Sequence, residues 1–402
     1  MTVAATTAST RTGFAMILII AVAVVVLGVI WNPTQDGVLK GTSLTPETVV
    51  ARVQSDQTYP DALRTLLQTT RANPGDLAAA KAAARATINA GRDAGDSRMV
   101  GASLGILRPF LATPDSETLY LAATARQYQH DFPGALKLLD QALERDPGDV
   151  NARLTRATIQ TVEGRFTTAE AECRALNAAP GVAFLCQATA LLMTAEAPAL
   201  EQRLTLILQQ PGLMDPSLQP WAIGLLGELA QLNNENPKAR DYFQQVLAAS
   251  PKSLRDRLIL ADLMLQDGLA DQVAPLLKDA PATDGVLIRR VLAAMALNTD
   301  STTDREDLAK RFQLNLDLGL TAHAREEARY FLEIARDPAL ALHRAQVNWA
   351  MQHEFEDAQL LIAAAMAAGQ PAAAQPVLDW AADQKVTAPA LQLDDLKKRL
   401  AP

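Results

Sequence analysis

Aromatic side chains are scarce in this sequence: they make up only 4% of its 402 residues, although 49% of the residues are hydrophobic. Strands are enriched in β-branched and aromatic residues, whereas Ala and Leu, which supply most of the apolar surface here, favour helices. The composition therefore predicts closely packed helices rather than sheets. It also excludes an intrinsically disordered chain, which has far fewer apolar residues.

Concentrated positive charge is also missing. The formal net charge is −8, and no basic stripe with interleaved aromatic residues is present, so nucleic acid is excluded as a partner. The basic pairs Arg289-Arg290 and Lys397-Lys398 are isolated, and we expect them on solvated helix faces.

Residues that carry chemistry are few. The four histidines, His130, His323, His343 and His353, do not stand at metal-ligand spacing from one another or from a cysteine. The sequence contains no H-E-x-x-H, G-x-S-x-G or P-loop motif. We therefore expect no metal, no cofactor and no catalytic residue, and hence a protein that is not an enzyme.

A single long apolar run is present at Phe14–Trp31. Its 18 residues, at about 1.5 Å each, would span about 27 Å as a helix, close to the thickness of a bilayer core. A cleaved signal peptide is the competing interpretation, but Val29, Ile30 and Trp31 do not form an A-x-A-like site. The pattern predicts one transmembrane helix, and Arg11 places residues 1–13 in the cytoplasm.

Small residues recur at a fixed spacing along the rest of the chain. Ala135, Ala169, Ala239 and Val273 are separated by 34, 70 and 34 positions. A bulky or apolar residue follows each of them four positions later, and another small residue precedes each by twelve positions. These partners are, in order, Leu139, Cys173, Phe243 and Leu277, and Ala123, Ala157, Gly227 and Ala261. Pro147 and Pro251 close two of the units.

This pattern resembles the tetratricopeptide repeat, W-x₂-L-G-x₂-Y…A-x₃-F…P. Residues 116–149 and 220–253 are the clearest copies. The resemblance implies an all-α solenoid of TPR-like helical hairpins, in which small residues lie where two helices cross. Amphipathic hairpins without a continuous superhelix remain the alternative. A membrane-anchored bacterial member of the family would lie in the inner membrane, with its solenoid in the periplasm.

The domain organisation follows from these segments. We expect a cytoplasmic N-terminus at residues 1–13, a transmembrane helix at 14–31, a linker at 32–45 and a TPR-like solenoid at 46–297. The polar segment 298–304 breaks the helical pattern. Residues 305–402 are expected to form an irregular TPR-like lobe that ends in a capping helix.

The two cysteines, Cys173 and Cys186, flank an expected interhelical turn at residues 179–181. Two such positions on antiparallel helices can face each other, so an oxidising compartment would favour a disulfide. Two small buried apolar residues are the alternative.

The resemblance also implies a binding surface, because TPR proteins hold peptides on the exposed side of the first helix of each hairpin. The residues carried over to this protein-binding groove are Glu117, Tyr120, Thr124, Gln127, Tyr128, Asn151, Leu154, Thr158, Trp221, Glu228 and Gln231. The expected function is that of an adaptor or assembly scaffold for a protein or peptide partner, including envelope, respiratory or cytochrome complex assembly. The alternative is a helical enzyme or carrier that binds a small molecule or glycan in the inner groove.

Overall fold

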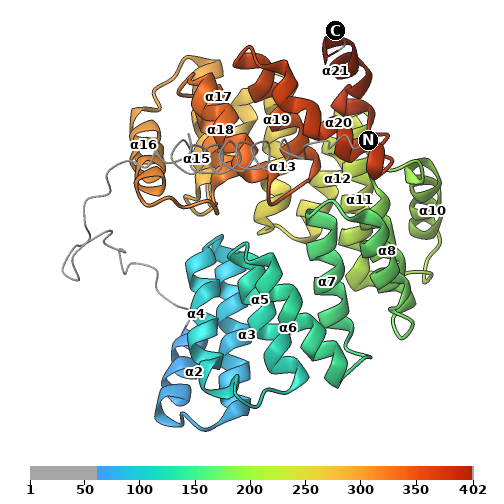
Figure 1. The fold of residues 1–402 in the computed structure, drawn as a ribbon, viewed down its shortest axis with the longest axis vertical. Helices are drawn as coiled ribbons and strands as arrows, with labels where there is room; N and C mark the ends of the chain where they lie inside the picture. The colour runs from blue at the N-terminus through green and yellow to red at the C-terminus, as the bar shows by residue number, and fades with distance from the viewer. Residues whose placement is uncertain (1–60, 401–402) are drawn as a thin grey trace, which may run out of the picture. The chain divides into compact units, whose positions relative to one another are not determined.

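A computed structural model of the protein describes residues 61–400 (Figure 1). The described chain is built from helices joined by short loops, and its helices have the following bounds: α2 Asp61–Ala72, α3 Leu77–Ala94, α4 Ser97–Leu107, α5 Ser116–Tyr128, α6 Phe132–Arg145, α7 Val150–Val162, α8 Phe166–Arg174, α9 Pro180–Leu191, α10 Ala197–Gln209, α11 Gln219–Leu232, α12 Asn236–Ala249, α13 Leu254–Gln266, α14 Ala270–Leu276, α15 Asp284–Leu297, α16 Thr302–Asp317, α17 Ala324–Glu333, α18 Pro338–Trp349, α19 Phe355–Ala367, α20 Gln375–Asp383 and α21 Leu393–Leu400. Four short 3₁₀ turns, η1 Arg108–Phe110, η2 Pro216–Leu218, η3 Pro371–Ala374 and η4 Pro389–Leu391, link some of them.

The helices pair into hairpins that stack along the chain. Helix α3 packs on α4, α5 on α6, α7 on α8, α11 on α12 and α17 on α18. The first helices of successive hairpins also contact each other, as α3 contacts α5 and α5 contacts α7. A helix that touches both its own partner and the next first helix extends one core through the array. Over the described residues, the predicted all-α solenoid of TPR-like hairpins is confirmed.

Aspartates begin several of the helices. The carboxylates of Asp115, Asp131 and Asp149 accept hydrogen bonds from the backbone amides of Thr118, Gly134 and Ala152 at 2.8, 3.0 and 3.0 Å. These amides belong to the first helical turn, where no carbonyl of the same helix is available to them. Each capping aspartate thus sets the residue at which its helix begins.

The turns within the hairpins share a left-handed backbone. The residues at φ +60°, +71°, +60° and +73° are His130, Gly164, Asn234 and Gly268, which lie 34, 70 and 34 positions apart. Glycine, asparagine and histidine tolerate this conformation better than most residues do. The turn therefore repeats with the same period as the small residues.

Small residues lie at the helix crossings, as expected. Ala123, Ala135 and Leu139 are completely or almost completely buried in one cluster between α5 and α6. A Cβ atom at Gly227, on α11, would lie 2.9 Å from the ring of Phe243 on α12. Without a side chain at this position, α11 approaches the aromatic ring directly.

The localisation prediction requires a correction. Within residues 61–400, no helix is long and apolar enough to cross a membrane. The expected span at residues 14–31, together with residues 1–13 and the linker at 32–45, lies outside the described residues. The prediction of a bacterial inner-membrane protein with a cytoplasmic N-terminus and a periplasmic solenoid is therefore wrong by this finding. The predicted break at 298–304 falls on the loop between α15 and α16, and its role as a domain boundary stays a prediction.

Late parts of the array return to contact early ones within one compact unit. The indole Nε1 of Trp380 donates to the carbonyl of Gly164 at 3.2 Å, and the amide of Phe166 donates to Gln384 Oε1 at 2.9 Å. A little farther along, the amide of Thr387 donates to the carbonyl of Met193 at 2.7 Å. We call this contact the seam. On one side of it lie the turns at 129–131, 162–166 and 193–194, and on the other side lie the segments 352–353 and 380–387.

Candidate protein-binding surface

One residue near the start of several first helices recurs with the period of the repeat. These residues are Glu117 on α5, Asn151 on α7, Trp221 on α11 and Arg255 on α13, at intervals of 34, 70 and 34 positions. All four keep accessible surface: Asn151 is exposed, Trp221 is half-buried, and the side chains of Glu117 and Arg255 are 39% and 61% exposed. We call this set the first-helix row.

Ion pairs join the two charged members of the row, Glu117 and Arg255, to neighbouring first helices. Lys81, on α3, reaches Glu117 at 2.8 Å, and Arg255 reaches Glu228 on α11 at 2.8 Å. Pairs this exposed contribute little to stability, commonly less than about 1 kcal/mol. Their charged groups therefore remain available to a partner that offers a matching charge.

A more buried network continues along the later first helices. The carboxylate of Asp262, on α13, binds the guanidinium groups of Arg289 on α15 and Arg329 on α17. Burial acts to raise the pKa of Asp262, but the two arginines outweigh it and hold that pKa below its usual value. The side chain of Arg289 is only 13% exposed, so the expectation that it lies on a solvated helix face was wrong.

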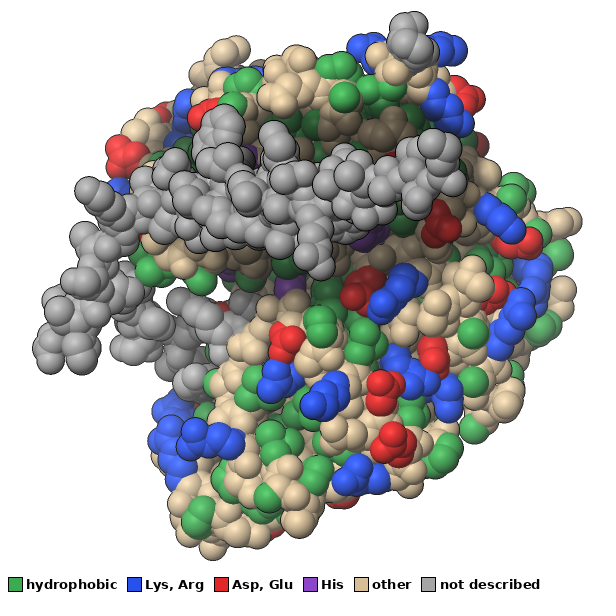
Figure 2. All heavy atoms as spheres, viewed as in Figure 1, with side chains coloured by type: hydrophobic (Ala, Val, Ile, Leu, Met, Phe, Trp, Pro, Cys, Tyr) green, Lys and Arg blue, Asp and Glu red, His purple; other side chains and the backbone are tan. Residues whose placement is uncertain are grey.

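Arg325, on α17, performs a similar role at the last hairpins. Its guanidinium binds Asp357, which is 2.6 Å away, and Glu354 near the start of α19. Glu356 stands beside this pair, and burial followed by the charge of Glu354 raises the pKa of its carboxyl. Figure 2 shows acidic and basic side chains interspersed over the visible face rather than gathered in one area of a single sign.

The residues predicted for the groove differ in exposure: two are buried, two are exposed and the others are half-buried. Thr124 and Gln231 are only 2% and 8% exposed, so they pack inside the array and offer no surface to a partner. Tyr120 is half-buried against two core clusters. Asn151 and Thr158 on α7 are exposed. The remaining predicted residues, Glu117, Gln127, Tyr128, Leu154, Trp221 and Glu228, are half-buried.

Two of the predicted aromatic residues have structural partners. The guanidinium of Arg92, on α3, lies 5.0 Å from the ring centroid of Tyr128. The indole Nε1 of Trp221 donates to Thr189 Oγ1 at 3.2 Å, which joins α11 to α9. These contacts fix the orientation of both rings while part of each ring stays accessible.

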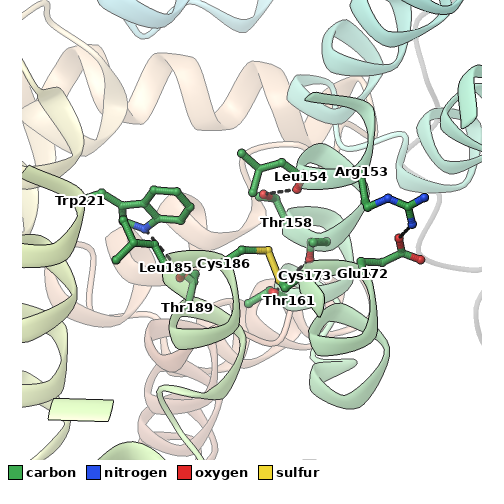
Figure 3. The surroundings of a disulfide bond; sticks show 11 residues. Arg153, Leu154, Thr158, Thr161, Glu172, Cys173, Leu185, Cys186, Thr189 and Trp221 are labelled. Carbon is green, nitrogen blue, oxygen red and sulfur yellow. Dashed lines mark hydrogen bonds and ion pairs between the residues drawn. A yellow bond between two sulfur atoms is a disulfide. The ribbon is translucent and has the colours of Figure 1, made fainter. Parts of the chain in front are cut away.

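Cys173 and Cys186 form a disulfide, with Cα atoms 5.4 Å apart. The bond links the end of α8 to α9, beside the half-buried Leu154 of α7 (Figure 3). Because α8 and α9 belong to successive hairpins, the disulfide crosses a boundary between hairpins. The predicted disulfide is confirmed.

Between residues 61 and 400, no group of three or more His, Cys, Asp or Glu side chains is placed to hold a metal ion. A pocket of about 330 Å³ lies between α6, α7 and α8. Its central Arg156 binds Asp140 at 2.8 Å and Glu172 at 2.7 Å, so its charge is already balanced.

Comparison with known proteins identifies part of the array. Residues 128–181, which run from the end of α5 to the start of α9, match the tetratricopeptide repeat family model. Within this segment, the chain is similar to the tetratricopeptide repeat family. No curated protein matches the sequence.

Among solved structures, the chain is similar to the following three. The Cut9–Hcn1 hetero-tetramer of the APC/C matches with a TM-score of 0.40 and 14% identity over 80% of this chain and 68% of that chain. A tetratricopeptide repeat protein from Parabacteroides merdae matches with a TM-score of 0.34 and 14% identity, over 76% of this chain and 99% of that chain. Yeast Tom70 matches with a TM-score of 0.36 and 12% identity, over 84% of this chain and 84% of that chain.

Proposed function

We propose that this chain is a protein-interaction scaffold that binds a protein or peptide partner along the first-helix row and catalyses no reaction. The recurrence of Glu117, Asn151, Trp221 and Arg255 at the same place in successive hairpins supports this proposal more than any other observation. A row with this period presents side chains from equivalent places of several first helices, which suits an extended or helical chain that crosses several hairpins.

The chemistry of the row favours a polar partner with some apolar anchors. Arg255 and Glu117 supply opposite charges, while Trp221 and Leu154 supply half-buried apolar surface between them. Interfaces commonly combine such anchors with a polar rim. In its finer form, the proposal makes the partner a component of a complex under assembly, of which respiratory and cytochrome complexes are examples.

Site-specific photo-crosslinking tests this proposal. A photoreactive amino acid is placed at Asn151 or Thr158, which are exposed on α7, and in a control at Glu144, which is exposed on the second helix α6. If the first-helix row binds the partner, the same discrete adduct forms at both α7 positions and is absent at Glu144. Adduct at Glu144 alone would move the binding surface to the second helices.

The same experiment separates the scaffold from an enzyme or carrier. The partner protein identified in the α7 adduct must also bind the purified protein described here. Changing both Asn151 and Thr158 to Arg must weaken that binding. An enzyme or carrier that binds only a small molecule would form no protein adduct at either position. Its activity would depend instead on ionisable residues in one pocket, such as Arg156 and Glu172.

A further inference from the structure

Two histidines lie at the seam, on opposite sides of it. His130 belongs to the turn between α5 and α6, and His353 belongs to the segment between α18 and α19. The backbone amide of His353 donates to the carbonyl of Val162 at 2.7 Å. Each imidazole therefore occupies a contact between segments that are more than 150 residues apart in the sequence.

The ring of His353 is enclosed by aromatic side chains. Its centroid lies 4.3 Å from that of Trp349 and 6.0 Å from that of Trp380. Its Nδ1 atom is buried without a hydrogen-bond partner. In the neutral ring the proton is therefore placed on Nε2, because a proton on Nδ1 would meet no acceptor. A second proton would place a charged donor at Nδ1, where no acceptor is available.

The ring of His130 is also held in one neutral form. Gln352 Oε1 accepts a hydrogen bond from Arg325 at 2.8 Å, so the amide nitrogen of Gln352 faces His130 Nδ1, also at 2.8 Å. An amide nitrogen is a donor, and therefore His130 Nδ1 must be the acceptor and carry no proton. Protonation of Nδ1 would set two donors against each other at the centre of this contact.

We propose that the seam is a pH-sensitive closure, which holds while His130 and His353 are neutral and separates when both become protonated. Separation releases the turns of the early hairpins from the segments 352–353 and 380–387. The inference concerns the chain's own contacts, so it stands or falls independently of the proposed function.

The surrounding charges agree with this direction. Burial lowers the pKa of His353, and its bond to Glu163 opposes this only in part. At His130, burial again lowers the pKa; Glu326 and Glu354 favour the cation, whereas Arg325 and His323 oppose it. Beside His353, the charges of the early turn, Glu163 and Arg165, pair with each other.

The sign of the effect follows from these lowered pKa values. When the seam is open, both rings regain a pKa near the ordinary value of 6.5, so the open form binds more protons than the closed form. Closure is therefore complete above pH 6.5 and weakens as the pH falls below it. A group kept neutral in the closed form changes the closing equilibrium by up to about tenfold for each pH unit below its ordinary pKa.

Hydrogen exchange of three amides measures closure directly. The amides of His353, Phe166 and Thr387 donate across the seam, so their protection reports whether it is closed. After correction for intrinsic exchange rates, we expect their protection to fall by up to about tenfold per histidine between pH 7.5 and 5.5. Protection of the amide of Ala135, which bonds to Asp131 within its own hairpin, should not change in parallel.

Variants identify the groups responsible. His130→Gln and His353→Gln should each remove part of the pH dependence, and the double variant should remove all of it, whereas the exposed His343→Gln should leave it intact. Gly164→Ala should open the seam at pH 7.5, so the amide protection measured in this variant shows what an open seam gives. A Cβ there would lie 2.4 Å from Trp380 Nε1 and 2.7 Å from His353 Cβ. Gly268→Ala is its control, with the same left-handed backbone and no atom within 4 Å of an added Cβ.

Two outcomes would overturn the inference. One is equal protection of the three cross-seam amides at pH 7.5 and 5.5 in the unaltered protein. The other is a pH dependence that survives in full in the double histidine variant. If the double variant stayed open at every pH, the two single variants, each with a reduced but measurable pH dependence, would decide the question.

Discussion

Cys173 and Cys186 join the second helix of one hairpin to the first helix of the next, at a sequence separation of 13. Most contacts between hairpins in this array are non-covalent, such as the packing of α6 on α7. The disulfide links its two hairpins covalently beside Leu154 and Trp221, which pack against the same cluster.

Loss of this bond should destabilise the protein without unfolding it. In the chain-entropy description, a closed loop of this length contributes up to about 3 kcal/mol. Cys173→Ala with Cys186→Ala should lower the free energy of unfolding by that amount or less, and reduction of the unaltered protein should do the same. Denaturant titration measures both. Two alkylatable thiols in protein purified without reductant would contradict the bond.

Glycine positions should respond to alanine according to the space around them. Gly227→Ala would press a methyl group into the ring of Phe243, and overpacking of this kind costs about 1–3 kcal/mol. Gly105→Ala, within α4, meets no atom within 4 Å and should stabilise the helix by about 0.5–1 kcal/mol. Thermal unfolding of the two variants should therefore shift in opposite directions, and a shift in the same direction would refute the assigned crossing.

Asp262→Asn should be costly because it removes the only carboxylate common to Arg289 and Arg329 among the described ion pairs. Breaking a largely buried pair costs about 3 kcal/mol. Since the pKa of Asp262 is lowered in the folded state, its contribution is present above pH 3.8 and disappears as the pH falls below that value. Denaturant titrations at pH 7 and pH 3 should thus show a smaller difference between variant and unaltered protein at pH 3. The exposed Glu306, paired with Lys310, provides the control: Glu306→Gln should change stability by less than about 0.5 kcal/mol.

His323 should act in the opposite sense to the seam histidines. Its hydrogen bond to Asp284, at 3.1 Å, raises its pKa in the folded state. The stabilisation is therefore fully present below pH 6.5 and is lost as the pH rises through the raised pKa. We expect His323→Gln to cost about 1 kcal/mol at pH 5.5 and little at pH 9. An equal cost at both pH values would show that the ring acts only through packing.

The sequence was sufficient to predict the features that repeat. Ala135 and Gly227 could be placed because a period of 34 positions assigns them to the same points of successive hairpins, and the two cysteines because they flank one interhelical turn. The left-handed turn residues follow the same period, and Gly164, Asn234 and Gly268 were visible in the sequence as a signal for it. The exposed Asn151 likewise follows from the register alone.

Contacts between distant hairpins were not predictable in this way. The pairing of Asp262 with Arg329 spans 67 positions, and that of Trp380 with Gly164 spans 216 positions. Such contacts depend on the curvature of the whole array, which small rotations between successive hairpins determine together. Thr124 was misplaced because its polar side chain suggested exposure, whereas it is buried and its hydroxyl donates to the carbonyl of Tyr120 at 2.9 Å.

The seam also restricts how this protein can change in length. An open solenoid can gain or lose one repeat, because each unit contacts only its neighbours. Here, the hydrogen bonds of Gly164 to Trp380 and of Met193 to Thr387 are made only when the right number of hairpins lies between the two sides. Deleting or duplicating one unit of 34 residues would bring a different turn opposite Trp380. The number of repeats between the two sides of the seam is therefore fixed, because only one number brings the paired residues opposite each other.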